Sequence, residues 1–67
     1  MSETVPAAHV QIGDAVYQHG KGFRRVFDVS TVTSGETVFL THHGEVRQLH
    51  MRTLVSVVRN GDMGDDS

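Results

Sequence analysis

The chain has 67 residues and no cysteine, so it has room for one domain and cannot form a disulfide framework or a thiolate metal site. Six Lys and Arg against eight Asp and Glu give a net charge of −2, which lacks the strong positive excess typical of nucleic-acid-binding domains. The longest apolar runs are triplets such as residues 38–40, too short for a signal peptide or a membrane span, so we expect a cytoplasmic protein that does not enter the membrane.

The two ends of the chain differ in composition from its middle. Residues 1–8 have no hydrophobic period and contain the only proline, whereas residues 60–67 are rich in glycine and aspartate. This pattern predicts a flexible leader and a flexible acidic tail around a domain that spans residues 9–59. Residues 9–60 hold six basic and four acidic side chains, and the ends hold four acidic side chains and no basic one. The domain is therefore mildly basic, and the ends offset its charge.

Five segments rich in β-branched residues follow one another in the domain, separated mostly by glycine turns. They are residues 15–18, 23–32, 37–42, 45–50 and 54–59. The second segment has no clean period of two, which predicts a bulge or a strong bend. Residues 51–53 are too short for a strand and suit one 3₁₀ turn. Because no window keeps a helical period, the sequence predicts an all-β, five-stranded SH3-like barrel with a short 3₁₀ turn before the last strand.

Phe23, Arg24 and Arg25 form the most suggestive cluster for binding. An aromatic ring beside two guanidinium groups is a common arrangement for holding phosphate, acidic side chains or the face of a base. Arg47 and Arg52 flank the fourth predicted strand and extend the candidate patch. We therefore predict a partner-binding surface made of these five residues, with solvated arginines as the alternative that remains open.

No constellation predicts catalysis or metal binding. Five histidines are a high count, but the adjacent His42 and His43 point to opposite faces of a strand, and the others have no spacing that makes them converge. We therefore expect solvated histidines and no metal site. No serine lies in a nucleophile elbow, and Gly20-Lys21-Gly22 is too short for a phosphate loop. We expect a non-enzymatic protein with no catalytic residue and no cofactor.

The segment Ile12-Gly13-Asp14-Ala15-Val16-Tyr17-Gln18-His19-Gly20, followed by Arg25-Val26-Phe27-Asp28-Val29, resembles the RNA polymerase interaction domain. CarD-type transcription regulators and transcription-repair coupling factors share this module. The closing residues 54–59 match its Leu-x-x-Val-x-Arg pattern, but the Val-Pro before the final turn is replaced by His50-Met51, and the DNA-binding helical domain of CarD-type regulators is missing. The resemblance implies a binding module for a protein, such as RNA polymerase, or for nucleic acid, acting in transcription or DNA transactions. An origin in a phage or mobile element also stays open.

A second resemblance implies an enzyme. Type II plasmid-borne dihydrofolate reductases are tetrameric SH3-like barrels of similar length that use NADPH, and a Val-Gln-Ile-Tyr strand lines their active pore. Residues 47–50, Arg-Gln-Leu-His, lie near that position, where only Gln48 matches directly and His50 replaces the tyrosine. Homo-oligomerisation would be required for this alternative, and it would also stabilise so small a domain.

Overall fold

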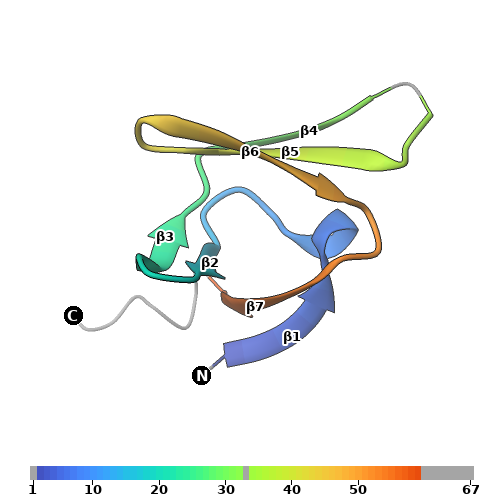
Figure 1. The fold of residues 1–67 in the computed structure, drawn as a ribbon. Coiled ribbons are helices and arrows are strands. Elements are labelled where there is room, and N and C mark those ends of the chain that lie inside the picture. Colours follow the sequence, from blue (N-terminus) through green and yellow to red (C-terminus); the bar gives the residue numbers. More distant parts are fainter. Residues whose placement is uncertain (1, 33, 60–67) are drawn as a thin grey trace.

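The fold is all-β, as predicted, in the computed structural model shown in Figure 1, which describes residues 2–32 and 34–59. The elements in chain order are β1 (Ser2–Pro6), the 3₁₀ helix η1 (Ala7–His9), β2 (Ala15–Gln18), β3 (Gly22–Arg25), β4 (Asp28–Thr31), β5 (Thr37–His42), β6 (Glu45–His50) and β7 (Leu54–Val58). Within those described ranges, no helix has the length and apolar character needed to cross a membrane.

The strands form two antiparallel sheets rather than one closed barrel. Sheet A has the strand order β1-β7-β2-β3, and sheet B has the order β4-β5-β6. All five predicted segments contain strands, but the part of the chain that the structure describes has seven strands instead of five. The difference arises because β1 was not expected and because residues 23–32 divide into β3 and β4.

Val26 and Phe27 are the point where this long segment changes sheets. The Val26 N–H donates a hydrogen bond to the Asp14 carbonyl at 2.8 Å, beside β2, whereas the Phe27 N–H donates to the Thr41 carbonyl at 2.7 Å, in β5. Val26 is fully buried between the sheets and Phe27 is exposed. The irregular apolar spacing therefore marks a corner, which is a sharper form of the predicted bend.

Residues 2–6, which the sequence indicates as a leader outside the domain, form an edge strand. Each residue of β1 pairs with β7, from Ser2 opposite Val58 to Pro6 opposite Leu54. Ala7 then turns into the core, where it is fully buried and donates its N–H to the Thr53 carbonyl at 2.8 Å. The predicted acidic tail, residues 60–67, lies outside the described residues.

The predicted 3₁₀ turn at residues 51–53 is a hydrogen-bonded turn, closed by the Thr53 N–H and the His50 carbonyl at 2.9 Å. The 3₁₀ helix of the described chain is instead η1, at Ala7–His9. Both segments lie at one end of the molecule, because the Ala8 N–H donates to the Met51 carbonyl.

The core lies between the inner faces of the two sheets. Its fully buried large side chains are Leu40, Val16, Val26, Val38 and Val57. Side chains along β5 alternate, so Val38, Leu40 and His42 point inward, and their partners Leu49, Arg47 and Glu45 on β6 share that face. The space between the sheets is consequently apolar over most of its length and polar towards the β5–β6 turn.

Candidate functional site

Strand β3 divides the predicted Phe23-Arg24-Arg25 cluster between two faces. Arg24 is opposite Val16, which is buried in the core, and so points towards sheet B. Phe23 is opposite Tyr17 and Arg25 is opposite Ala15, so both point to the outer surface of sheet A. The alternation of side chains along a strand therefore separates the two adjacent arginines.

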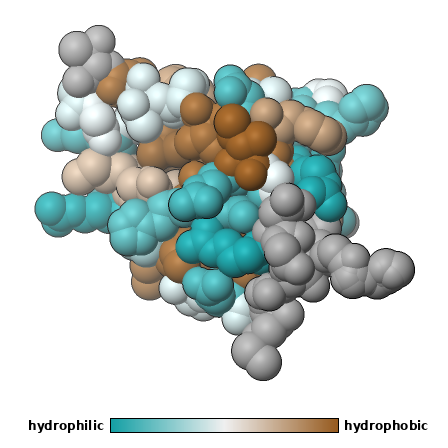
Figure 2. All heavy atoms as spheres, turned by 180° about the vertical axis from the view of Figure 1, so that it is seen from behind, coloured by the Kyte–Doolittle hydropathy of each residue, from teal (hydrophilic) through white to brown (hydrophobic). Residues whose placement is uncertain are grey.

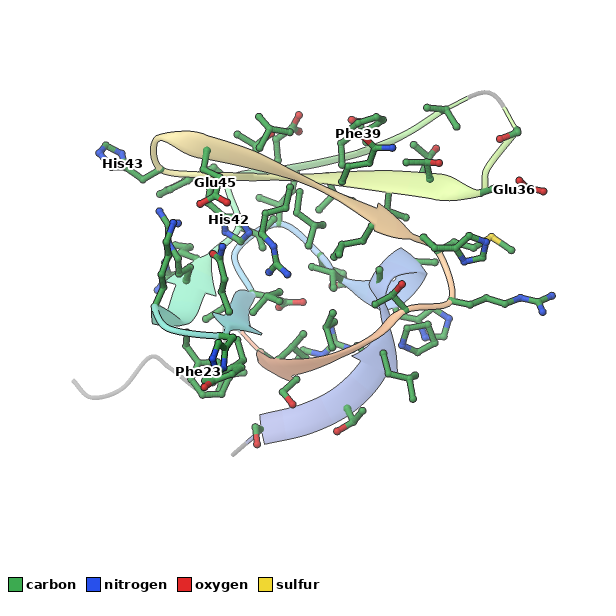
Figure 3. The ribbon with its side chains drawn as sticks, in the orientation of Figure 1. Phe23, Glu36, Phe39, His42, His43 and Glu45 are labelled. Carbon is green, nitrogen blue, oxygen red and sulfur yellow. The ribbon has the colours of Figure 1, made fainter. Side chains whose placement is uncertain are left out.

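Arg24 connects the tips of two hairpins through Glu45. One of its Nη atoms lies 2.6 Å from a Glu45 carboxylate oxygen, and the other donates to the His43 carbonyl at 2.7 Å. Gln18 and Lys21 each donate to the same carboxylate at 3.2 Å. The Gln18 hydrogen bond is the largest cause that lowers the pKa of Glu45 from 4.5 to about 2, followed by Lys21, with a smaller contribution from Arg24. Figure 3 shows Glu45 between β6 and the β2–β3 hairpin.

His42 and Arg47 occupy the same polar end of the space between the sheets. His42 is 2% exposed, and its Nδ1 lies 3.0 Å from the Arg25 carbonyl oxygen. Because a carbonyl oxygen only accepts, Nδ1 carries the proton in this bond. His42 Nε2 and Arg47 Nη1 are buried and have no hydrogen-bond partner within the described chain. The expectation of a solvated histidine is wrong for His42, because β5 turns its ring inward.

The other four histidines, His9, His19, His43 and His50, are exposed as expected. Figure 3 shows His43 pointing away from the β5–β6 turn while His42 points between the sheets. Across residues 2–32 and 34–59, no three His, Cys, Asp or Glu side chains are grouped closely enough to hold a metal ion.

Arg52 lies apart from the other four predicted residues. It is exposed in the turn between β6 and β7, where its N–H donates to His50 Nδ1 at 3.1 Å. This turn follows the end of β6 that is remote from the β5–β6 turn. The five predicted residues thus lie in three places: Arg24 and Arg47 between the sheets, Phe23 and Arg25 on the outside of sheet A, and Arg52 in a turn.

The outer surface of sheet A has an aromatic pair that the sequence reading did not assemble. The Tyr17 and Phe23 rings meet edge to face with centroids 5.5 Å apart, and the two side chains are 46% and 48% exposed. Strand alternation places ten residues on this side of sheet A, which we call the aromatic face, although Ala15 is only 2% exposed: Ser2, Thr4, Pro6, Ala15, Tyr17, Phe23, Arg25, Leu54, Ser56 and Val58. Tyr17 follows the buried Val16 in β2, and side chains alternate along a strand. Alternation from Val16 could therefore have predicted that Tyr17 points outward.

Charge is unevenly distributed between the two sides of sheet A. The aromatic face has one charged residue, Arg25, and no acidic one. On the other side, Arg59 donates to the 4% exposed Asp14 carboxylate at 2.6 Å and lies 3.5 Å from Glu3. The Asp14 hydrogen bond raises the pKa of Arg59. Asp14 also accepts the Gln11 N–H at 2.9 Å, so the Gly-Asp motif has a structural role here.

Comparison with models of known families, with curated proteins and with solved structures finds no match to this chain. The site therefore has to be interpreted from its own geometry and chemistry.

Proposed function

We propose that the protein is a non-enzymatic binding module that holds a partner protein on its aromatic face. The observation that carries this proposal is the Tyr17–Phe23 pair, two rings in contact that each leave about half of their surface exposed. Aromatic and arginine side chains are enriched in the centres of protein interfaces, and Arg25 flanks this pair on the same face. The exposed Leu54 adds apolar surface on β7.

Other exposed apolar side chains make a weaker case for a binding surface. Ile12, Phe27 and Val46 are each more than half exposed, but none of them takes part in an aromatic pair. Figure 2 shows the molecule from behind, where hydrophobic areas are separated by a hydrophilic band. Single exposed apolar side chains are normal on protein surfaces, whereas contacting aromatics are better suited to anchor a partner.

The distribution of charge favours a protein partner over nucleic acid. Lys21 and Arg24 share the Glu45 carboxylate, and Arg59 is paired with Asp14 and Glu3. A nucleic-acid surface usually needs several cations along one face to contact successive phosphates. The aromatic face has Arg25 as its one charged residue, and this arginine donates to the Gly13 carbonyl at 2.9 Å, so the face has no such row of cations.

We also propose that the fold is a variant of the SH3-like barrel opened into two sheets. The five predicted segments contain strands in the expected order, and a hydrogen-bonded turn precedes β7. Together with the resemblance of residues 12–59 to the RNA polymerase interaction domain, this order makes RNA polymerase the first partner to test.

Site-specific photo-cross-linking tests the binding surface directly. A benzoylphenylalanine introduced at position 23 is expected to cross-link purified core RNA polymerase, because Phe23 belongs to the exposed aromatic pair that carries the proposal. The same photoreactive residue at position 46 is the matched control, since Val46 is also exposed but lies on the outer surface of sheet B. Equal cross-linking from the two positions, or none from position 23, would contradict the polymerase assignment.

The class of partner is tested by titration. A single-stranded oligonucleotide is expected not to bind, and tight binding that weakens steeply with salt would refute the choice of a protein partner. If polymerase is not cross-linked, repeating the cross-linking in the native host and identifying the products by mass spectrometry tests the surface itself. Products specific to position 23 would retain the binding module, and their absence would overturn it.

A further inference from the structure

We propose that the polar end of the space between the sheets binds inorganic phosphate through Arg47 and His42. The proposal starts from two side-chain atoms, Arg47 Nη1 and His42 Nε2, which are buried and have no hydrogen-bond partner within residues 2–32 and 34–59. A buried polar atom without a partner costs free energy, and such atoms are rare in folded proteins. This site lies between the sheets and the aromatic face lies on the outside of sheet A, so the two proposals stand or fall separately.

Strand pairing brings the two side chains together. Arg47 on β6 is opposite Leu40, and His42 is two residues further along β5, so Arg47 and His42 are diagonal neighbours on the inner face of sheet B. Diagonal neighbours in an antiparallel pair are about 7–8 Å apart at the backbone, a separation that a long side chain crosses. Figure 3 shows the His42 ring pointing into the space between the sheets. One small ion can therefore contact both side chains.

Arg47 is a cation without a carboxylate partner. Its guanidinium group forms no ion pair and no hydrogen bond with the residues that the structure describes. The Glu45 carboxylate on the same inner face already accepts hydrogen bonds from Arg24 and Lys21. Two cations and one carboxylate give +1, and Arg47 raises the net charge of these four side chains to +2. A bound anion would offset this excess and give the guanidinium group a charge-assisted hydrogen bond.

The tautomer of His42 selects the kind of anion. Because Nδ1 donates to the Arg25 carbonyl oxygen at 3.0 Å, Nε2 of the neutral ring has a lone pair and accepts. A matching ligand donates one hydrogen bond to Nε2 and accepts one from Arg47 Nη1. Inorganic phosphate has both a P–OH group and charged oxygens at neutral pH. Sulfate has no proton to donate, and a phosphate monoester, with a second pKa of about 6, is mostly a dianion without a P–OH group.

The open edge of sheet B gives a small ion access. Arg47 lies on the edge strand β6 and is only partly buried, whereas His42 is 2% exposed, so an ion meets Arg47 first. No pocket opens among the described residues, which excludes a large ligand. Strands β3 and β6 belong to different sheets, and their connection at this end is the contact between the Arg24 and Glu45 side chains. Movement of side chains alone is therefore enough to admit the ion.

Phosphate titration of the full chain, followed by ¹⁵N NMR at neutral pH and constant ionic strength, tests the site. We expect saturable shifts of the Arg47 and His42 side-chain signals with a dissociation constant of about 1 mM. Sulfate and phosphoserine should bind at least about tenfold more weakly, because neither supplies the proton that Nε2 accepts. Equal or tighter binding of sulfate would refute the donor–acceptor match, and tighter binding of phosphoserine would refute inorganic phosphate as the ligand. No saturable shift would leave water as the partner of both atoms and overturn the proposal.

Matched variants separate the site from a general attraction of anions to positive charge. Arg47→Gln should weaken phosphate binding at least about tenfold, whereas Arg52→Gln, which removes the same charge from the exposed turn after β6, should change it less than about twofold. Equal losses from the two variants would overturn the assignment.

His42→Asn tests the role of Nε2. The asparagine amide can still donate to the Arg25 carbonyl, as Nδ1 does, but it lacks the acceptor at Nε2. The affinities for phosphate and sulfate should then lie within about threefold of each other. Undiminished selectivity in a variant whose amide spectrum remains native would show that His42 does not contact the ion. The comparison of phosphate with sulfate in the unsubstituted chain keeps the proposal testable if this variant does not fold.

Discussion

Replacing Asp14 with alanine is expected to be one of the most destabilising polar substitutions in this chain. The Asp14 side chain is 4% exposed, and one carboxylate oxygen accepts two hydrogen bonds, from Arg59 at 2.6 Å and from the Gln11 N–H at 2.9 Å. A hydrogen bond to a charged group contributes about 1.5–3 kcal/mol. Arg59 remains 28% exposed and keeps Glu3 at 3.5 Å, which reduces the penalty of leaving its charge unpaired.

These contacts together predict that Asp14→Ala lowers the free energy of unfolding by about 2–4 kcal/mol. A chain of this size is expected to have only about 3–10 kcal/mol in total. Since 1 kcal/mol shifts the melting temperature of such a domain by about 4–8 °C, the variant should melt roughly 10–25 °C lower. Asp14→Asn should cost less, because an amide oxygen can still accept the Gln11 N–H.

Urea denaturation followed by far-UV circular dichroism measures the loss, because the chain has no tryptophan to report unfolding. The double-mutant cycle with Arg59→Ala isolates the ion pair, and we expect a coupling free energy of at least about 1 kcal/mol. A coupling near zero would show that the two residues do not stabilise one another, and would refute the structural role given to the Gly-Asp motif. Glu45→Ala is the comparison, and its cost should be smaller because the Glu45 side chain is 30% exposed.

The remaining predictions address other elements. Because the pKa of Glu45 is lowered from 4.5 to about 2, its contribution to stability is present above pH 4.5 and lost as the pH falls towards 2; Glu45→Gln should flatten this part of a urea midpoint–pH profile. Gly44 has φ of 81° with open space around it, so Gly44→Ala should cost about 1 kcal/mol of backbone strain in the same assay, and a neutral result would refute the turn geometry. Deleting residues 1–6 should lower the melting temperature, since β1 pairs along its whole length with β7, whereas a dispensable leader would leave it unchanged. The reductase alternative predicts a tetramer that reduces dihydrofolate with NADPH and loses activity in Gln48→Leu; we expect sedimentation and a coupled NADPH assay to show neither.

The sequence predicted strands well where local and global preferences agree. Residues 37–42 and 45–50 lie on either side of the His43-Gly44 turn, and they form β5 and β6 with the expected bounds. Gly35 and Gly44 both have positive φ, the conformation for which a glycine turn was expected. In these segments the local turn signal and the antiparallel pairing of β5 with β6 favour the same structure.

Prediction failed where a distant partner decides the structure. Residues 2–6 have little apolar pattern of their own, and they become a strand because β7 offers a free edge for pairing. The corner at Val26 and Phe27 depends on Asp14 and Thr41, which lie 12 and 14 residues away in the sequence. No local signal separates such a corner from a bulge.

The predicted site residues lie on different faces for a simpler reason. The sequence analysis places Arg24 and Arg25 in one patch, whereas adjacent residues of a strand point to opposite faces. That rule alone would have separated them, and it would have placed Phe23 with Arg25. The pairing of Arg24 with Glu45, 21 residues away, needed the structure.

Strand β3 shows how folding and binding are divided between its two faces. On its inner face, Arg24 connects the two hairpin tips, so this arginine contributes to the fold. On its outer face, Phe23 contacts Tyr17. This contact leaves both residues about half exposed, so it buries little apolar area and contributes little to stability. A small domain with limited apolar surface loses stability when it leaves two of its four aromatic side chains in this position. The proposed binding function would account for that loss, because a partner that covers the aromatic face would bury the same exposed area.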